Sequence, residues 1–412
     1  MANTLKFGNG EWYGKKDTIL AYNDENSNYK PLPFDFARAS KATVVNKDGL
    51  IETVGSGEPR IDYKDDSKGA LLLEPSRSNS LLQSNQFDTT WTLSSSIALT
   101  SGQSGVGGST DAWLLKKTDA ASRYINQTIT LSSSTYSYSV FAKKESGNWL
   151  YVRLADSGGS LASTSYFDLE NGVVGSTSAD SLSIHSYNNG WYRCEVKFTH
   201  SIGNVRMYPA VGDGSPSGGS GGEGIYIQNA QLEQGNYPTS YIPTSGSAVT
   251  RLADDIDTDF GTILPLNGEV SVYMEMLGQP SDVINTTGKV VSVNFDETTN
   301  SSSYVALNFN GTNWRARVQG ATGNNFVSFE VDQTETIKAL FVLRPTSYAL
   351  YANGSLIGSE TRTYGGTAPN MNEISKVIYL MQTDDFGITK NKDLRVYNTA
   401  LSNAEAIALT QV

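Results

Sequence analysis

The chain has 412 residues, a formal net charge of −11 and a hydrophobic share of 38%. This length allows two or three domains of roughly 150 residues each, and the composition is that of a folded globular protein. The chain is acidic and has no run rich in Lys or Arg, so it lacks the basic surface expected of a nucleic-acid-binding protein. A single Cys and two His leave no thiolate cluster for zinc and few candidates for a catalytic relay.

Apolar runs in this sequence are short. None approaches the roughly 20 residues of a membrane helix, and the first residues lack the apolar core of a signal peptide. We therefore expect no membrane insertion, and folding in the compartment where the chain is made.

Residues 1–85 are punctuated by turn-forming residues and hold little apolar surface of their own. Such a segment is predicted to pack on other modules or on another subunit. We interpret it as an extended N-terminal arm that anchors the protein, and we expect the rest of the chain to fold without it.

Residues 86–242 alternate apolar and polar side chains over short stretches rich in aromatic and β-branched residues, which is typical of antiparallel sheets. Many such strands at close spacing predict a β-sandwich or jelly roll. The predicted strands are 135–142, 148–154, 165–169, 190–198, 205–208 and 225–232, with Asn-Gly pairs at 171–172 and 189–190 as turns.

A connection follows at 235–247, where two prolines prevent a helix or central strand from continuing. The alternating pattern then restarts, so residues 243–412 predict a second β-sandwich. Ser402 and Glu405 form a capping box, and Ala404, Ile407 and Ala408 supply an apolar stripe, so the sequence predicts a short C-terminal helix. The fold class is therefore all-β. The expected strands are 269–276, 289–295, 303–309, 314–318, 326–331, 336–343, 347–351 and 376–381.

Two stretches near the C-terminus carry a family resemblance. The segments YALYANGSLIG at 348–358 and KDLRVYNTALSNAEAIAL at 392–409 resemble the closing half of a concanavalin A-like or laminin-G-like domain. That resemblance implies a hairpin around an Asn-Gly turn and a last strand followed by a capped helix. It implies little about the ligand, because this fold serves many functions.

Two further resemblances cover most of the remaining chain. The middle module is similar to carbohydrate-binding jelly rolls through DTTW at 88–91, YSVF at 138–141, GWYR at 190–193 and QLEQG at 231–235. Other segments resemble recurring stretches of bacteriophage virion proteins and imply a virion component: FARAS at 36–40, GLIE at 49–52, PRID at 59–62, LLLEPSRSN at 71–79, YIPT at 241–244 and VTR at 249–251.

Exposed aromatic residues are the candidates for glycan binding, since aromatic rings offer apolar faces to sugar C–H groups. Trp149 and Tyr151 follow Gly147-Asn148, and Trp314 lies between Asn313 and Arg315. The alternative is packing within the sheets, which we expect for Trp191 because its strand is otherwise apolar.

Asp255, Asp257 and Asp259 are the candidates for a metal site, because calcium binds several carboxylate oxygens from one loop. The run departs from an EF-hand loop, with Phe260 where Gly is required and Leu266 where a bidentate Glu is required. A solvated linker also explains these charges. We expect no resident cofactor, with calcium as the open alternative.

Catalytic signatures are missing from the sequence. The segment EVSVYME at 269–275 does not match the Glu-x-Asp-x-x-Glu strand of concanavalin-like glucanases. His185 and His200 are interpreted as surface or capping residues, and Cys194 as an inert buried strand residue. We therefore expect no enzyme, and therefore no catalytic residue.

The leading hypothesis is a structural protein of a bacteriophage particle, either a head or tail fibre, a decoration protein or an adaptor subunit. The arm would bind other virion proteins, and the sandwiches would be exposed on the particle for host attachment through surface glycans. By analogy with fibres we expect a homo-oligomer, such as a trimer, synthesised in the host cytoplasm. The alternatives are a polysaccharide depolymerase and a lectin-like adhesin.

Overall fold

The structure is a computed structural model that describes residues 4–10, 13–15, 18–23, 28–160, 162–258, 269–278, 289–294, 304–309, 313–320, 323–330, 335–361, 376–380 and 388–412. The chain divides into two compact units, which we call the terminal unit and the central unit. The terminal unit contains Met1–Lys47, Val54–Ser76 and Leu252–Val412, and the central unit contains Asp48–Thr53 and Arg77–Arg251. The central unit therefore interrupts the sequence of the terminal unit.

Antiparallel strands make up nearly all regular structure in the described residues, which confirms the predicted all-β class. The exceptions in this part of the chain are one short 3-10 turn, η1 (Asn188–Gly190), and one α-helix, α1 (Asn403–Thr410). No helix among the residues searched is long and apolar enough to cross a membrane.

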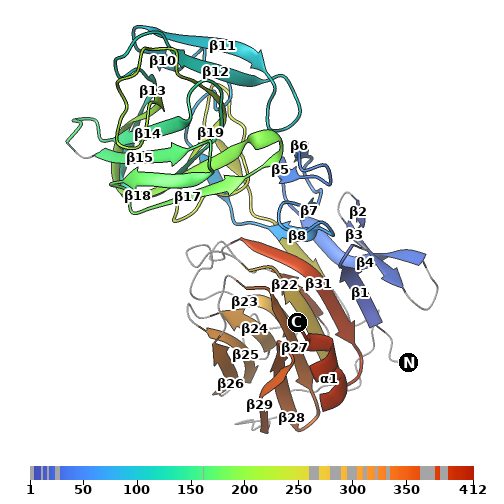
Figure 1. The fold of residues 1–412 in the computed structure, drawn as a ribbon. Coiled ribbons are helices and arrows are strands. Elements are labelled where there is room, and N and C mark those ends of the chain that lie inside the picture. The colour runs from blue at the N-terminus through green and yellow to red at the C-terminus, as the bar shows by residue number, and fades with distance from the viewer. Residues whose placement is uncertain are drawn as a thin grey trace. The chain divides into compact units, whose positions relative to one another are not determined.

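The central unit is a β-sandwich built around two long strands, β13 (Ile125–Lys144) and β18 (Tyr192–Ala210) (Figure 1). Register shifts between Thr128 and Ser134 bend β13, so that each half of the β13–β18 pair joins a different layer. The other strands are β9 (Arg77–Asn79), β10 (Thr92–Leu93), β11 (Ile97–Gln103), β12 (Ala112–Lys117), β14 (Trp149–Ala155), β15 (Ala162–Asp168), β16 (Val173–Thr177), β17 (Ser181–Ser186), β19 (Gly224–Gln234) and β20 (Val249–Arg251). The remaining strand, β6 (Ile51–Val54), belongs to the central unit except for its last residue, Val54.

One layer of the sandwich has the order β11, β12, β19, β13, β18, β17, and the other has the order β10, β13, β18, β14, β15, β16. Alternate residues of both layers point into one core, which includes Leu150, Val152, Cys194 and Met207. Cys194 is buried as predicted. Trp191 is 1% exposed, which confirms its predicted packing, although it lies in a separate cluster with Phe141.

The connection at 235–247 packs on the central unit. Asn79 donates a side-chain hydrogen bond to the carbonyl of Ile242 at 2.9 Å, and the hydroxyls of Ser84 and Tyr241 lie 2.6 Å apart. Buried Glu233 accepts hydrogen bonds from the Thr239 amide at 2.7 Å and the Thr239 hydroxyl at 2.6 Å. The segment is thus bound along its length, and the central unit continues past the predicted boundary at residue 242 to the β9–β20 pair.

The terminal unit combines strands from both ends of the chain. Its strands are β1 (Thr4–Gly8), β2 (Tyr13–Lys15), β3 (Thr18–Asn23), β4 (Asn28–Ala37), β5 (Ala42–Val45), β7 (Arg60–Asp62), β8 (Ala70–Leu73), β21 (Asp255–Thr258), β22 (Val270–Met276), β23 (Lys289–Asn294), β24 (Tyr304–Phe309), β25 (Asn313–Gly320), β26 (Gly323–Glu330), β27 (Ile337–Leu343), β28 (Ser347–Ala352), β29 (Ser355–Thr361), β30 (Lys376–Leu380) and β31 (Thr389–Tyr397).

Pairing within the terminal unit differs from the prediction of a separate arm at 1–85. β1 and β8 both pair with β31, and β4 pairs with β21, so the first strands belong to the same sheets as the last ones. The physical reason is that alternation shows where a strand lies in the sequence but not which partner satisfies its backbone groups.

The C-terminal helix α1 begins as the capping box predicts. Ser402 accepts a hydrogen bond from the Glu405 amide, and the Glu405 side chain accepts one from the Ser402 amide at 2.8 Å. The helix lies against β27 and β28 (Figure 1). Its buried residues are Ala406 and Thr410, whereas the predicted contact residues Ala404 and Ala408 are exposed. The preceding hairpin turns at Asn353 and Gly354, whose φ angles of 44° and 79° confirm the Asn-Gly turn.

Candidate functional site

A row of four tyrosines crosses one outer face of the central sandwich. Tyr166 of β15 is paired with Tyr151 of β14, and Tyr151 is paired with Tyr208 of β18. Tyr124, just before β13, lies beside Tyr208 with ring centroids 5.1 Å apart and an interplanar angle of 54°. Because side chains alternate along a strand, Leu150 and Val152 on either side of Tyr151 point into the core. We call Tyr166, Tyr151, Tyr208 and Tyr124 the tyrosine row.

The rings of the tyrosine row cover one another. The ring centroids of Tyr151 lie 4.5 Å from those of both Tyr166 and Tyr208, with interplanar angles of 8° and 30°. This spacing is close to the separation of neighbouring strands, so the sheet itself sets the stack. Tyr151 is only 6% exposed because both faces of its ring are covered.

In the middle of the tyrosine row, the groups available to bind a ligand are the tyrosine hydroxyls. Within the described residues, the hydroxyls of Tyr151 and Tyr166 have no hydrogen-bond partner, yet they are not among the buried unpaired polar atoms. Burial raises the pKa of Tyr151, Tyr166 and Tyr208, which keeps these phenols protonated at neutral pH. A protonated phenol both donates and accepts hydrogen bonds, as sugar hydroxyls require.

Trp149, a predicted glycan-binding residue, lies on the same face one alternation away from Tyr151. It is half-buried and packs against the tyrosine cluster. A Cβ atom at Gly175 of β16 would lie 2.8 Å from Cζ3 of Trp149 and 2.7 Å from Oδ1 of Asp213. Glycine at position 175 therefore leaves room for the indole between β16 and the loop that carries Asp213.

The structure brings Trp149 and Tyr151 together but changes the expected use of Tyr151. Its ring faces are covered, so Tyr151 does not provide the stacking platform that the sequence suggested. The third predicted residue, Trp314, is on β25, and its side chain lies outside the described residues.

Two arginines flank the tyrosine row on the side away from Trp149. Arg153 of β14 is directly paired with Arg206 of β18. Arg206 donates a hydrogen bond from Nε to Oδ1 of Asn126 at 3.2 Å, and its guanidinium carbon lies 4.5 Å from the centre of the Tyr124 ring. At the opposite end, the Asp168 carboxylate accepts hydrogen bonds from Glu170 and Asn171 and so stabilises the β15–β16 turn.

Among the residues that the structure describes, no group of three or more His, Cys, Asp or Glu is placed to hold a metal. The Asp255 side chain is exposed, although partial desolvation by neighbouring groups raises the pKa of its carboxyl. The Asp257 side chain and the whole of Asp259 lie outside the described residues, so the calcium prediction stays a prediction.

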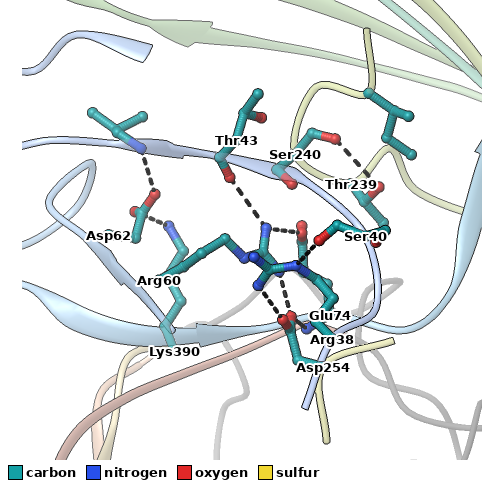
Figure 2. Close-up of polar contacts among 12 residues, drawn as sticks. Arg38, Ser40, Thr43, Arg60, Asp62, Glu74, Thr239, Ser240, Asp254 and Lys390 are labelled. Carbon is teal, nitrogen blue, oxygen red and sulfur yellow. Dashed lines mark hydrogen bonds and ion pairs between the residues drawn. The ribbon is translucent and has the colours of Figure 1, made fainter. Parts of the chain in front are cut away.

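The acidic run begins one residue before Asp255, at Asp254, and the Asp254 side chain is not solvated. Asp254 is 2% exposed and forms ion pairs with Arg38, at 2.9 Å, and with Arg60, as Figure 2 shows. Arg60 also pairs with Glu74 at 2.6 Å and donates a hydrogen bond to the Thr43 carbonyl at 3.2 Å. We call Arg38, Arg60, Glu74 and Asp254 the buried arginine cluster.

Electrostatics hold this cluster in its charged form. Burial alone would lower the pKa of the Arg60 guanidinium, but the carboxylates of Asp254 and Glu74 outweigh that effect and raise it. The Glu74 amide also donates to Asp254 at 2.9 Å. The interpretation of the acidic run as a solvated linker is therefore wrong for Asp254, because its opposite charges, Arg38 and Arg60, lie 216 and 194 residues earlier in the sequence.

Both histidines are half-buried. His185 lies 3.4 Å from the Glu195 carboxylate, and Nε2 of His200 lies 3.1 Å from the Ser163 hydroxyl. Burial raises the pKa of the Cys194 thiol well above its ordinary value, which suits the inert role predicted for it.

Sequence reasoning missed Tyr124, Tyr166, Tyr208, Arg153 and Arg206 as members of the face. The signal was present within β14, where Trp149, Tyr151 and Arg153 share one alternation. For the other strands the register across the sheet was needed, because a sequence does not show which residues lie opposite one another.

No family model matches this chain. No curated protein matches it either. Solved structures similar to it include the CBM40 domain of a Ruminococcus gnavus sialidase bound to α2,3-sialyllactose, at 16% identity and a TM-score of 0.31, covering 37% of this chain and 86% of that one.

Domain 4 of a GH43 arabinanase from Geobacillus stearothermophilus, solved with arabinotriose, is similar at 15% identity and a TM-score of 0.31, covering 43% of this chain and 84% of that one. A botulinum neurotoxin type C structure is similar at 10% identity and a TM-score of 0.30, covering 38% of this chain and 39% of that one. These similarities are weak, so the fold class comes from the described strands of this chain itself, which are antiparallel, and its function has to be argued from its own residues.

Proposed function

We propose that this chain is a non-enzymatic structural component of a bacteriophage particle that binds glycans through the tyrosine row of its central unit. The observation that carries the glycan-binding part is the row itself: four tyrosines from adjacent strands on the outer face of a sandwich, with unpaired hydroxyls on Tyr151 and Tyr166 among the described residues.

Sugar recognition needs both polar and apolar contacts. The hydroxyls of the row supply donors and acceptors in fixed positions, since each ring is held by its neighbours. Two half-buried rings, Trp149 beside Tyr151 and Tyr124 at the end of the row, supply aromatic surface for sugar C–H groups. Little side-chain entropy is lost on binding because the rings are already ordered.

The proposed virion role rests on the segments that resemble bacteriophage virion proteins and on the buried arginine cluster to which they contribute residues. Three of these segments contribute Arg38, Arg60 and Glu74 to the buried arginine cluster, and Asp254 follows a fourth, at 249–251, by three residues. Their resemblance therefore falls on residues that maintain the fold of the terminal unit. In this proposal the protein is a homo-oligomer exposed on the particle surface.

The test of glycan binding is an array of bacterial surface polysaccharides probed with the wild-type protein and a Y151F/Y166F variant. We expect wild-type binding and roughly tenfold weaker binding by the variant, from the loss of two hydrogen bonds of about 0.5–1.5 kcal/mol each. The matched control is Y226F, which removes a phenol from the other layer of the sandwich and should leave binding unchanged.

The same incubations of protein with polysaccharide also test whether the protein is a depolymerase. Polysaccharide recovered after incubation should keep its chain length, and shortening that depends on one or two acidic residues would contradict a non-enzymatic role. Antibody labelling of intact phage particles tests the virion role. Absence of the protein from purified particles would contradict that part of the proposal.

A further inference from the structure

We propose, resting on the glycan-binding function above, that the tyrosine row selects acidic saccharides, with Arg153 and Arg206 as the receptor for a carboxylate or sulfate group. The two arginines occupy directly opposite positions on β14 and β18, immediately beside the row. They form a positively charged edge beside the phenols of the row, and the Trp149 indole lies on the other side of Tyr151.

Two like charges in a direct cross-strand pair destabilise a sheet unless something compensates them. Arg206 has compensation from Asn126 and from the ring of Tyr124. Arg153 has no hydrogen bond or ion pair among the described residues, and its other strand partner is uncharged Thr164. An anion bound between the two guanidinium groups would supply the missing compensation.

Two carboxylates near Trp149 on this face, those of Asp168 and Asp213, do not take that role. Asp168 is paired with Trp149, which is four residues, or roughly 13 Å, along β14 from Arg153. Asp213 is occupied by the amide and hydroxyl of Ser176, each at 2.7 Å. The positive end of the row is therefore locally uncompensated in a chain whose net charge is −11.

Chemistry favours arginine for this role. A guanidinium binds a carboxylate or sulfate through two parallel N–H donors, and these charge-assisted hydrogen bonds are stronger than neutral ones. The Tyr151 hydroxyl, which has no hydrogen-bond partner among the described residues, belongs to the adjacent row, where it can bind a sugar hydroxyl next to the acid group. The overall negative charge of the protein acts weakly at this distance, because salt screens charges over about 8 Å.

The experiment measures affinity for matched pairs of saccharides that differ in charge alone. Oligogalacturonate is compared with its methyl ester, and dextran sulfate with dextran, so that the two arms distinguish carboxylate from sulfate. We expect the acidic member of at least one pair to bind the wild-type chain more tightly. R153Q should weaken that binding roughly 10- to 100-fold, and the neutral member should change less than about twofold.

Controls keep a folding defect apart from a binding defect. K116Q removes a positive charge from β12 in the other layer and should leave both affinities unchanged. R153K keeps the positive charge but lacks the two parallel N–H donors of the guanidinium, so it should lose less affinity for the acidic saccharide than R153Q does. The near-ultraviolet circular dichroism spectra of all variants should match that of the wild type.

Two outcomes would overturn the inference, and they are distinguishable. Equal affinity of the wild type for both members of each pair, or equal weakening of both by R153Q, would remove the acidic specificity and leave glycan binding intact. Failure of all four probes and of the polysaccharide array would overturn the proposed glycan-binding function as well.

Discussion

Asp254 lies between two buried guanidinium groups and is the residue on which the charge balance of the terminal unit depends. In D254N, Arg38 and Arg60 lose one shared counter-charge, and buried charges without partners are costly. We expect D254N to lower the stability of the terminal unit by roughly 3–5 kcal/mol. The measurement is the denaturant dependence of hydrogen exchange in peptides that cover β8.

The adjacent residue provides the control for that change. Asp255 is exposed, so D255N should alter stability by less than about 0.5 kcal/mol. Equal losses in the two variants would show that the buried arginine cluster does not stabilise the unit.

Glu195 makes the stability of the central unit depend on pH. Burial alone would raise the pKa of its carboxyl, but His185, Arg193 and Ser183 outweigh burial and lower it from the ordinary 4.5. The unfolded chain then binds a proton more readily than the folded one. The stabilisation is complete above the unfolded pKa and is lost as pH falls through the folded pKa.

The corresponding test is urea unfolding of E195Q and wild type between pH 3 and pH 7. At pH 7 we expect E195Q to be less stable by roughly 1–3 kcal/mol, with a difference that shrinks below about pH 4.5. E170Q, at an exposed carboxylate paired with Lys144, should show no such pH-dependent difference. A constant gap between E195Q and wild type across this range would contradict the assignment.

At the scale of the elements, α1 shows how a local signal acts through a tertiary contact. Its N-cap satisfies an amide that would otherwise lack a partner, and its inner face packs against Tyr273, Leu340 and Tyr351. S402A should destabilise the helix by roughly 0.5–2 kcal/mol. S402D keeps a capping oxygen and should restore most of the loss.

Hydrogen exchange of residues 403–410 is the measurement, because it reports the opening of this helix separately from the rest of the chain. If S402A and S402D exchange alike, the cap does not hold the helix end.

At the scale of the whole molecule, the terminal unit depends on strands that the sequence placed in a separate arm. A chain beginning at Arg77 lacks β1, β4 and β8, and therefore removes partners of β31 and β21. It also lacks Arg38, Arg60 and Glu74 of the buried arginine cluster. We expect residues 252–412 of this truncated chain to lose protection against proteolysis, and residues 77–251 to stay folded.

This expectation replaces the earlier one, in which both sandwiches fold without the first residues. Limited proteolysis with mass spectrometry distinguishes the two. An intact, protected 252–412 fragment would show that the N-terminal strands add to a unit that is already stable.

The sequence by itself determined the strand content, the Asn-Gly turn at 353–354, the capped helix and the burial of Cys194 and Trp191. These features depend on neighbours within a few residues, such as alternation along a strand or an oxygen three residues from an amide. Local patterns of this kind can therefore be predicted from the sequence alone.

Only the tertiary structure decided which residues act together. The tyrosine row combines residues 124, 151, 166 and 208, and the buried arginine cluster combines residues 38, 60, 74 and 254. Both depend on strand register and on pairing between distant segments, which a single sequence leaves open because many partners satisfy the same backbone groups. Tyr151, which the sequence predicted as an exposed aromatic residue for glycan binding, thus lies at the centre of a row, with its hydroxyl rather than its ring available for binding.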